Sequence, residues 1–184
     1  PSSAASDVYK RQKVDGVDVR KMAQKDVRDR IGYVPQKGVL FSGTIDSNIR
    51  YGKPEITDAQ VKEAAEVAQA TEFIDTKPEK YESPVSQGGT NVSGGQKQRL
   101  SIARAIAKDP EIFIFDDSFS ALDFKTDSQL RKALKEYTKD ATTVIVAQRI
   151  STILGADQII VLDDGHMAGI GTHKELMANC EVYQ

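Results

Sequence analysis

Two adjacent carboxylates follow an apolar run in the segment 115–123, which reads FDDSFSALD. The preceding residues 112–114 are isoleucine, phenylalanine and isoleucine, and an unbroken apolar run is typical of a buried strand. Carboxylate oxygens at the end of such a strand suit a hard cation that keeps several of its waters. The segment therefore predicts a site for a metal ion and a water molecule at Asp116 and Asp117.

A second candidate site is the glycine-containing turn VSGGQ, residues 92–96. Gly94 and Gly95 have no side chains, so their backbone N–H groups can approach a phosphate closely. They stand where a helix is expected to begin, and the helix dipole adds positive potential there. The hydroxyl of Ser93 can bind the same oxygens. A flexible turn with a good N-cap would explain these residues in isolation, but the acid-ended strand that follows favours phosphate binding.

Strand-like and helix-like segments alternate along the chain, which predicts an α/β sheet covered on both faces. Strands are expected at 14–19 (with a turn at 15–16), 30–35, 111–115, 143–147 and 158–162, with a hairpin turn at 164–165. Helices are expected from residue 57 or 58, after SGGQ, at 126–137 and 150–154, and from residue 173. The two apolar runs 111–115 and 143–147 are expected to be buried. On the helix after SGGQ, Lys97, Arg99 and Arg104 are expected to form a solvated or domain-facing side.

Composition restricts the class of protein further. The chain has 184 residues, enough for one domain with a core and too few for two ordinary ones. Its net charge of −2 gives no overall case for binding nucleic acid or an anionic membrane. The single cysteine, Cys180, excludes an internal disulfide, and no apolar stretch approaches the roughly 20 residues that span a bilayer. Residues 1–12 are small, polar and aperiodic, and are interpreted as a leader that is not native to the fold.

The order and spacing of the motifs resemble the nucleotide-binding domain of ATP-binding-cassette (ABC) transporters of the exporter type, from about residue 14 onward. The matching segments are VPQ (34–36, similar to the Q-loop), SGTIDSNI (42–49, the exporter stretch after it), VSGGQ (92–96, the signature motif), FIFDD (113–117, Walker B), SALD (120–123, the D-loop) and VAQRIST (146–152, the switch region). The resemblance implies a P-loop-NTPase-like α/β core. It also implies a helical signature subdomain at about 53–108, within a partial domain that spans 13–184.

The resemblance implies ATP and Mg²⁺ as the ligands. In that family the first acid of Walker B, which is Asp116 here, holds the Mg²⁺, and the Q-loop amide, Gln36, also reaches the metal. The positions of Asp117 and Gln148 are the catalytic ones. Considered alone, Gln36 would be interpreted as a solvent-exposed turn residue after Pro35.

The same resemblance implies a dimer of such domains, in which each ATP lies between the Walker motifs of one domain and the signature of the other. Ser93, Gly94, Gly95 and Gln96 would then bind the nucleotide of the partner domain. Asp123 would lie at the interface between the domains. It also has the type and position of a helix N-cap, and the two roles are compatible.

Two departures from the family pattern concern the catalytic positions. The family has Glu at the position of Asp117, and losing one methylene retracts the carboxylate by about 1 Å, which can cost on the order of 100-fold in rate. The family has a histidine at the position of Gln148, and an amide cannot carry a titrating proton near neutral pH. Together they predict the weakly hydrolytic half of a heterodimeric exporter.

A third departure is that no segment of the chain reads GxxxxGK(S/T), the phosphate-binding loop of Walker A. In the family this loop and the base-stacking aromatic come before the motifs found here. The chain is therefore expected to be a domain without its N-terminal Walker A portion and without the membrane-spanning part. By itself it is expected to bind ATP poorly, to have little activity and to be marginally stable.

The sequence thus predicts the ATPase domain of an ABC exporter, at the cytoplasmic face of the cell membrane. Its expected partners are a second, non-identical nucleotide-binding domain and the coupling helices of a transmembrane domain, and no nucleic acid. The alternative is a soluble ABC ATPase that acts on DNA or ribosomes. A DNA-repair member would separate the motifs with a long coiled coil, and a ribosomal member would carry two cassettes and a basic linker. Neither feature is present in the sequence.

Overall fold

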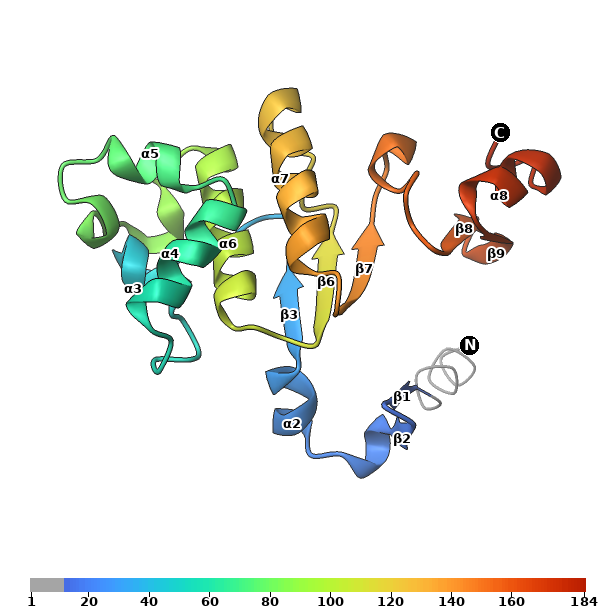
Figure 1. Ribbon diagram of the computed structural model, residues 1–184, viewed down its shortest axis with the longest axis horizontal. Coiled ribbons are helices and arrows are strands. Elements are labelled where there is room, and N and C mark those ends of the chain that lie inside the picture. Colours follow the sequence, from blue (N-terminus) through green and yellow to red (C-terminus); the bar gives the residue numbers. More distant parts are fainter. Residues whose placement is uncertain (1–11) are drawn as a thin grey trace. The chain divides into compact units, whose positions relative to one another are not determined.

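A computed structural model describes residues 12–184 of the chain, so the proposed leader lies almost entirely outside the described residues. The chain forms two compact units, which comprise Pro1–Val144 and Ile145–Gln184. The N-terminal unit contains the acid pair and the glycine-containing turn, and the C-terminal unit contains Gln148. Figure 1 labels most of the helices and strands of both units.

The helices and strands follow the alternation expected from the sequence (Figure 1). In the N-terminal unit they are β1 (Lys13–Val14), β2 (Val17–Asp18), α2 (Gln24–Asp29), β3 (Ile31–Val34), β4 (Gly43–Thr44), α3 (Ile45–Ile49), α4 (Asp58–Val67), α5 (Thr71–Asp75), β5 (Pro84–Val85), α6 (Gly94–Ala107), β6 (Ile112–Asp116) and α7 (Phe124–Tyr137). Strand β7 (Thr142–Val146) crosses from one unit to the other. The C-terminal unit adds β8 (Ile159–Asp163), β9 (His166–Gly171) and α8 (His173–Asn179). Short 3₁₀ turns occupy Val19–Lys21, Lys80–Glu82, Gln87–Gly89 and Ile150–Thr152.

The sheet that carries the acid pair has the strand order β3-β6-β7, and β3 runs parallel to β6. On one face Gly32 pairs with Phe113 and Val34 pairs with Phe115, and all four residues are buried. Helix α6 packs so closely on this face that a Cβ on Gly32 would lie 3.2 Å from the carbonyl oxygen of Ala105. Helix α7 covers the same face, because the rings of Phe113 and Tyr137 are 6.4 Å apart in an edge-to-face arrangement.

The opposite face of the sheet is more open, so the prediction of cover on both faces is wrong for the described residues. Tyr33 is 54% exposed on this face, and Ile114, its partner across the two strands, is only partly buried. The reason is that both long helices of the unit, α6 and α7, pack on the other face.

The prediction that the strand at 143–147 is buried is also wrong. Val144 and Val146 in β7 are 46% and 51% exposed, although their composition suits a core strand. In the described part of the chain β7 is the last strand of its sheet and pairs only with β6. A strand at the edge of a sheet has a neighbouring strand on one side only, so its side chains have fewer neighbours to pack against.

Two of the basic side chains on α6 are partly buried within their own unit, which corrects the expectation of a solvated or domain-facing side. Arg99 donates to the carbonyl of Gln69 at 2.7 Å and lies over the ring of Phe73 at 4.8 Å. Arg104 donates to the carbonyls of Asn48 and Val39 at 2.7 and 2.9 Å. Burial lowers the pKa of Arg104 to about 10.

The C-terminal unit is built on the hairpin expected at 164–165. Strands β8 and β9 are antiparallel, and the turn between them places Asp164 and Gly165 at φ values of 45° and 77°. Such a left-handed pair is the conformation of a two-residue hairpin turn, which Asp-Gly favours. Leu176 and Cys180 pack with Ile159 in the core of this unit. Within residues 12–184, no helix combines the length and apolarity needed to cross a membrane.

Candidate functional site

The acid pair lies where β6 ends and the chain turns. Asp116 is the last residue of β6, and Asp117 has a φ of 43°, a left-handed conformation that non-glycine residues rarely adopt. The hydroxyl of Ser118, which is fully buried, donates to the carbonyl of Val34 at 2.9 Å and ties this turn to β3. Left-handed backbone at a polar strand end is a feature that is more frequent at functional sites than elsewhere.

Each acid accepts a hydrogen bond from a neutral side chain on or just after β3. The hydroxyl of Tyr33 donates to Oδ2 of Asp116 at 3.0 Å. The amide of Gln36 donates to Oδ2 of Asp117 at 3.2 Å. Because β3 and β6 are parallel, their carboxyl ends meet at one edge of the sheet, and three of the sequence-predicted residues, Gln36, Asp116 and Asp117, lie there together.

A buried glutamine holds the loop that carries Gln36. Gln98 on α6 is 2% exposed, and its side chain bonds to both sides of this loop. Its amide donates to the carbonyl of Pro35 at 3.1 Å, and its carbonyl accepts from the N–H of Gly38 at 2.9 Å. The loop is therefore fixed to the signature helix by two hydrogen bonds that span 60 and 63 positions of the chain.

The turn VSGGQ forms the start of α6, as the sequence predicts. Ser93 is the N-cap of the helix, and it exchanges hydrogen bonds with Gln96 in a capping box. The N–H of Gln96 donates to Ser93 Oγ at 3.2 Å, and the N–H of Ser93 donates to Gln96 Oε1 at 3.1 Å. No hydrogen bond joins these two side chains to the acid pair in the described part of the chain, so they form a separate group.

The two glycines of this turn have different surroundings. A Cβ on Gly95 would contact the carbonyl oxygen of Ala121 at 3.5 Å, which places the helix start beside the segment SALD. A Cβ on Gly94, by contrast, would point into open space, with no contacting atom of the described residues within 4 Å. Packing within the chain therefore does not require a glycine at position 94, and glycine stabilises a helix less well than alanine.

The structure places Asp123 at the N-cap of α7, one of the two roles expected for it. The N–H and the hydroxyl of Thr126 donate to its two carboxylate oxygens at 3.0 and 2.7 Å. These hydrogen bonds, first the one from the hydroxyl, lower the pKa of Asp123. Gln148 lies in the C-terminal unit, two residues after the end of β7, and it is exposed.

The donor atoms at the acid pair are of the kind that bind a magnesium ion. The available groups are two carboxylates and the amide oxygen of Gln36, because the amide nitrogen is the atom that bonds to Asp117. All are hard oxygen donors, and Mg²⁺ is commonly held by one or two carboxylates with several waters retained. No group of three or more His, Cys, Asp or Glu side chains forms a candidate metal cage among residues 12–184. The donor set therefore fits Mg²⁺ bound jointly with a phosphate-bearing ligand.

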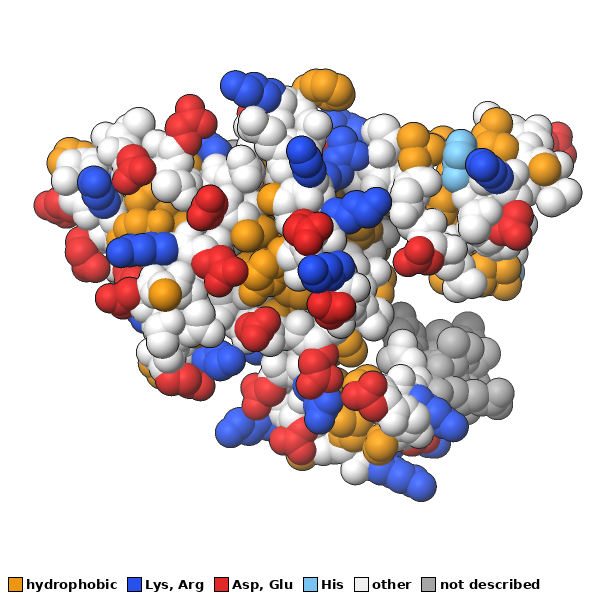
Figure 2. Space-filling model, viewed as in Figure 1, with side chains coloured by type: hydrophobic (Ala, Val, Ile, Leu, Met, Phe, Trp, Pro, Cys, Tyr) orange, Lys and Arg blue, Asp and Glu red, His pale blue; other side chains and the backbone are white. Residues whose placement is uncertain are grey.

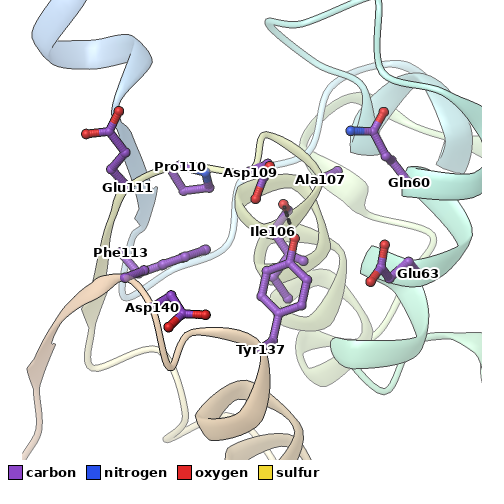
Figure 3. A pocket seen from close by; sticks show the side chains of 11 residues that line it. Gln60, Glu63, Ile106, Ala107, Asp109, Pro110, Glu111, Phe113, Tyr137 and Asp140 are labelled. Atoms are coloured by element: carbon purple, nitrogen blue, oxygen red, sulfur yellow. Dashed lines mark hydrogen bonds between the residues drawn. The ribbon is translucent and has the colours of Figure 1, made fainter.

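A separate pocket lies near the start of β6 (Figure 3). The acid pair lies at the other end of this strand. Its volume is about 530 Å³, and its lining includes Glu63, Asp109 and Phe113. Figure 3 shows the Tyr137 hydroxyl directed at the carbonyl of Ile106, to which it donates at 3.4 Å. Burial raises the pKa of Tyr137 to about 12, and the negative charges of Asp109 and Glu63 contribute. The pocket shares no lining residue with the acid-pair site.

Three residues of the site region were missed by sequence reasoning: Tyr33, Gln98 and Ser118. Tyr33 directly precedes the predicted VPQ segment, but nothing in a strand sequence indicates which acid a tyrosine will meet. Gln98 precedes Ile102 by one helical turn, so its position on the buried side of the helix was the available signal. Ser118 follows the acids directly, but its bond to β3 is a tertiary contact.

Comparison with known proteins gives one family and several close relatives. The model of the ABC transporter family matches residues 6–120. An uncharacterized ABC transporter ATP-binding protein of Mycobacterium tuberculosis is 47% identical over 173 residues, which is 92% of this chain and 29% of the relative. A Staphylococcus aureus protein, named as an ATP-binding/permease protein for multidrug export, is 44% identical over 171 residues, covering 93% of this chain and 30% of the relative.

The fold has a close match among solved structures. A bacterial Atm1-family ABC exporter with ATP bound superposes with a TM-score of 0.89 and 38% sequence identity. The match covers 93% of this chain and 30% of that one. The chain thus spans about 30% of the length of the relatives that it matches.

Proposed function

The chain belongs to the ABC transporter family of ATP-binding proteins, and we propose that it is part of the nucleotide-binding domain of an exporter. In this proposal the domain binds ATP and couples its hydrolysis in a domain dimer to substrate transport. A transmembrane domain anchors it at the cytoplasmic face of the cell membrane. Support comes from relatives named for export and from the similarity to an exporter whose structure contains ATP.

The observation that carries the proposal is the cluster at the end of β3 and β6. Gln36 and Asp117 are 81 positions apart in the sequence and are in hydrogen-bond contact at 3.2 Å, with Asp116 adjacent. In the proposed mechanism Asp116 and the amide oxygen of Gln36 hold the metal. Mg²⁺, when bound, would neutralise charge on the phosphate oxygens. Asp117 would orient the attacking water and accept its proton, with Gln148 hydrogen-bonding the terminal phosphate.

The same residues support a weakly hydrolytic site. The carboxylate of Asp117 is one methylene shorter than that of a glutamate, and the hydrogen bond from Gln36 holds it near β3. Gln148 can orient a phosphate but cannot exchange a proton near neutral pH. We therefore propose that this chain pairs with a non-identical second domain, in which catalysis is faster.

The signature turn is proposed to serve the nucleotide of that second domain. The space beside Gly94 is open, and Ser93 and Gly94 are exposed at the N-terminus of the 14-residue helix α6. Free N–H groups at a helix start attract phosphate oxygens. Neither side chain of the capping box bonds to the acid pair of its own chain, which is the arrangement expected if the signature completes the partner's site.

A partly apolar surface next to α3 is proposed to contact the coupling helices of the transmembrane domain. The rings of Phe41 and Tyr51 stack at 4.0 Å, and the guanidinium of Arg104 lies over both. Tyr51 is 55% exposed, so this aromatic stack reaches the surface. On the face of the N-terminal unit shown in Figure 2, acidic and basic side chains are interspersed, a pattern that gives no support to a nucleic-acid partner.

The asymmetric proposal is tested by two substitutions in the assembled heterodimer. Ser93→Arg places a bulky cation in the signature turn, and we expect it to abolish steady-state ATPase activity of the assembly. Asp117→Asn removes the charge of the weak site, and we expect it to leave that activity almost unchanged. Ser128→Arg, at an exposed position on α7, is the matched control for the size and charge of the arginine. Equal losses for Ser93→Arg and Asp117→Asn would contradict the asymmetry.

A further inference from the structure

Tyr33 occupies an unusual place for a tyrosine of a parallel strand. It lies on the open face of the sheet, is 54% exposed, and contributes little to the core. Its hydroxyl donates to Oδ2 of Asp116 at 3.0 Å. The two residues are 83 positions apart, so the contact depends entirely on the pairing of β3 with β6.

The strand register explains how the phenol reaches this acid. Tyr33 pairs with Ile114, and Asp116 is two residues further along β6, on the same face of the sheet. A side chain on one strand can reach the diagonal neighbour two residues along the next strand only if it is long. A phenylalanine here would have the same shape but no hydroxyl to reach the carboxylate.

We propose that Tyr33 is a positioning residue for the metal-binding carboxylate: its hydroxyl fixes the rotamer of Asp116 so that the second oxygen of this carboxylate is presented to the metal. This inference rests on the proposed function, in which Asp116 binds Mg²⁺ together with ATP. Tyr33 itself does not contact the metal or the nucleotide.

The chemistry of the phenol suits this role. A neutral donor orients a carboxylate without cancelling the negative charge that attracts the cation, whereas a lysine or arginine would compete with the metal. The hydrogen bond from Tyr33 uses Oδ2 and leaves Oδ1 available.

The two acids are thereby held by separate donors. Tyr33 bonds to Asp116, and Gln36 bonds to Asp117. If one acid were free to rotate, the carboxylates could turn toward each other or toward solvent, and the metal would first have to reorder them. Partners that orient metal ligands typically change metal affinity about 10- to 100-fold when they are removed.

The test is Tyr33→Phe in the full-length protein, with Mn²⁺ and ATP as the probe and electron paramagnetic resonance as the readout of free Mn²⁺. We expect the Kd for one bound Mn²⁺ per assembly to rise about tenfold. Because Tyr33 is 54% exposed, we expect the substitution to leave the fold unchanged. A second measurement, Raman spectroscopy, needs no metal or nucleotide. Subtracting the spectrum of the variant from that of the wild type leaves the tyrosine doublet of Tyr33. Its intensity ratio should be that of a phenol that donates a strong hydrogen bond.

Tyr183→Phe is the matched control, since it removes a phenolic hydroxyl whose hydrogen bond to His173 is also 3.0 Å long, in the C-terminal unit. It should leave Mn²⁺ affinity unchanged. Equal Mn²⁺ affinity of the wild type and Tyr33→Phe would overturn the positioning role while leaving the proposed function intact. A wild-type assembly that binds Mn²⁺ and ATP at neither site would instead overturn the proposed function.

Discussion

The acid pair and the start of α6 are both polar clusters, but the chain fixes them in different ways. At the acid pair the contacts join residues more than 80 positions apart, from Tyr33 to Asp116 and from Gln36 to Asp117. At the start of α6 the contacts between Ser93 and Gln96 span three positions. One cluster requires the sheet to be formed, and the other requires only one turn of helix.

This difference matters for how each cluster can be used. A locally capped turn presents its N–H groups whenever the helix exists, which suits a surface that completes a site on another domain. A cluster built across two strands responds to the distance between those strands and to the loop that follows β3. Gln98 connects the two regions, because it sits on α6 and holds the loop that carries Gln36.

The largest effect is expected from breaking this connection with Gln98→Leu. The substitution leaves the N–H of Gly38 and the carbonyl of Pro35 without their partner, and a buried group without a partner costs about 1–3 kcal/mol. The free energy of unfolding should fall by about this amount in guanidinium chloride titrations followed by circular dichroism. Gln129→Leu, at an exposed position of α7, is the control and should change it little. Equal stabilities of the two variants would contradict the bracing role of Gln98.

A smaller effect is expected from breaking the local cluster with Ser93→Ala. Loss of an N-cap hydroxyl costs about 1 kcal/mol, because the N–H of Gln96 loses its acceptor. The same unfolding measurement checks this, and Ser93→Thr should retain most of the stability. The distance between Gln36 and Asp117 should not change, so the two clusters should behave independently. A Ser93→Ala variant as unstable as Gln98→Leu would show that the cap is coupled to the loop.

The smallest effect is expected from Asp123→Asn, which tests a local cap through its charge. Hydrogen bonds from Thr126 lower the pKa of Asp123, so the carboxylate stabilises the fold above its ordinary pKa of about 4. This contribution is lost as the pH falls below that value and the group is protonated. Asparagine also caps helices, so stability near pH 7 should change little. Thermal melting at a series of pH values should show a shallower loss of stability below about pH 4 in the variant. If the loss of stability at acid pH is the same in the variant and in the wild type, Asp123 does not cause it.

Several features of the chain were determined by the sequence itself. The N-caps Thr57, Ser93 and Asp123, the turn at Asp164–Gly165 and the alternation of strands with helices all depend on residues close together in the chain. The ABC motifs could be recognised for the same reason, since each is a short segment in a fixed order. The comparisons with known proteins confirm the family.

Other features were decided only by the tertiary structure. The apolar composition of β7 indicated burial, but its place at the edge of the sheet leaves Val144 and Val146 exposed. The charge of Arg104 indicated exposure, but carbonyl acceptors and two aromatic rings hold it partly buried. The contact of Tyr33 with Asp116 depends on the register of two distant strands. The sequence determined which groups the site contains, whereas strand pairing decided which of them meet, because a hydrogen bond requires the correct distance and direction.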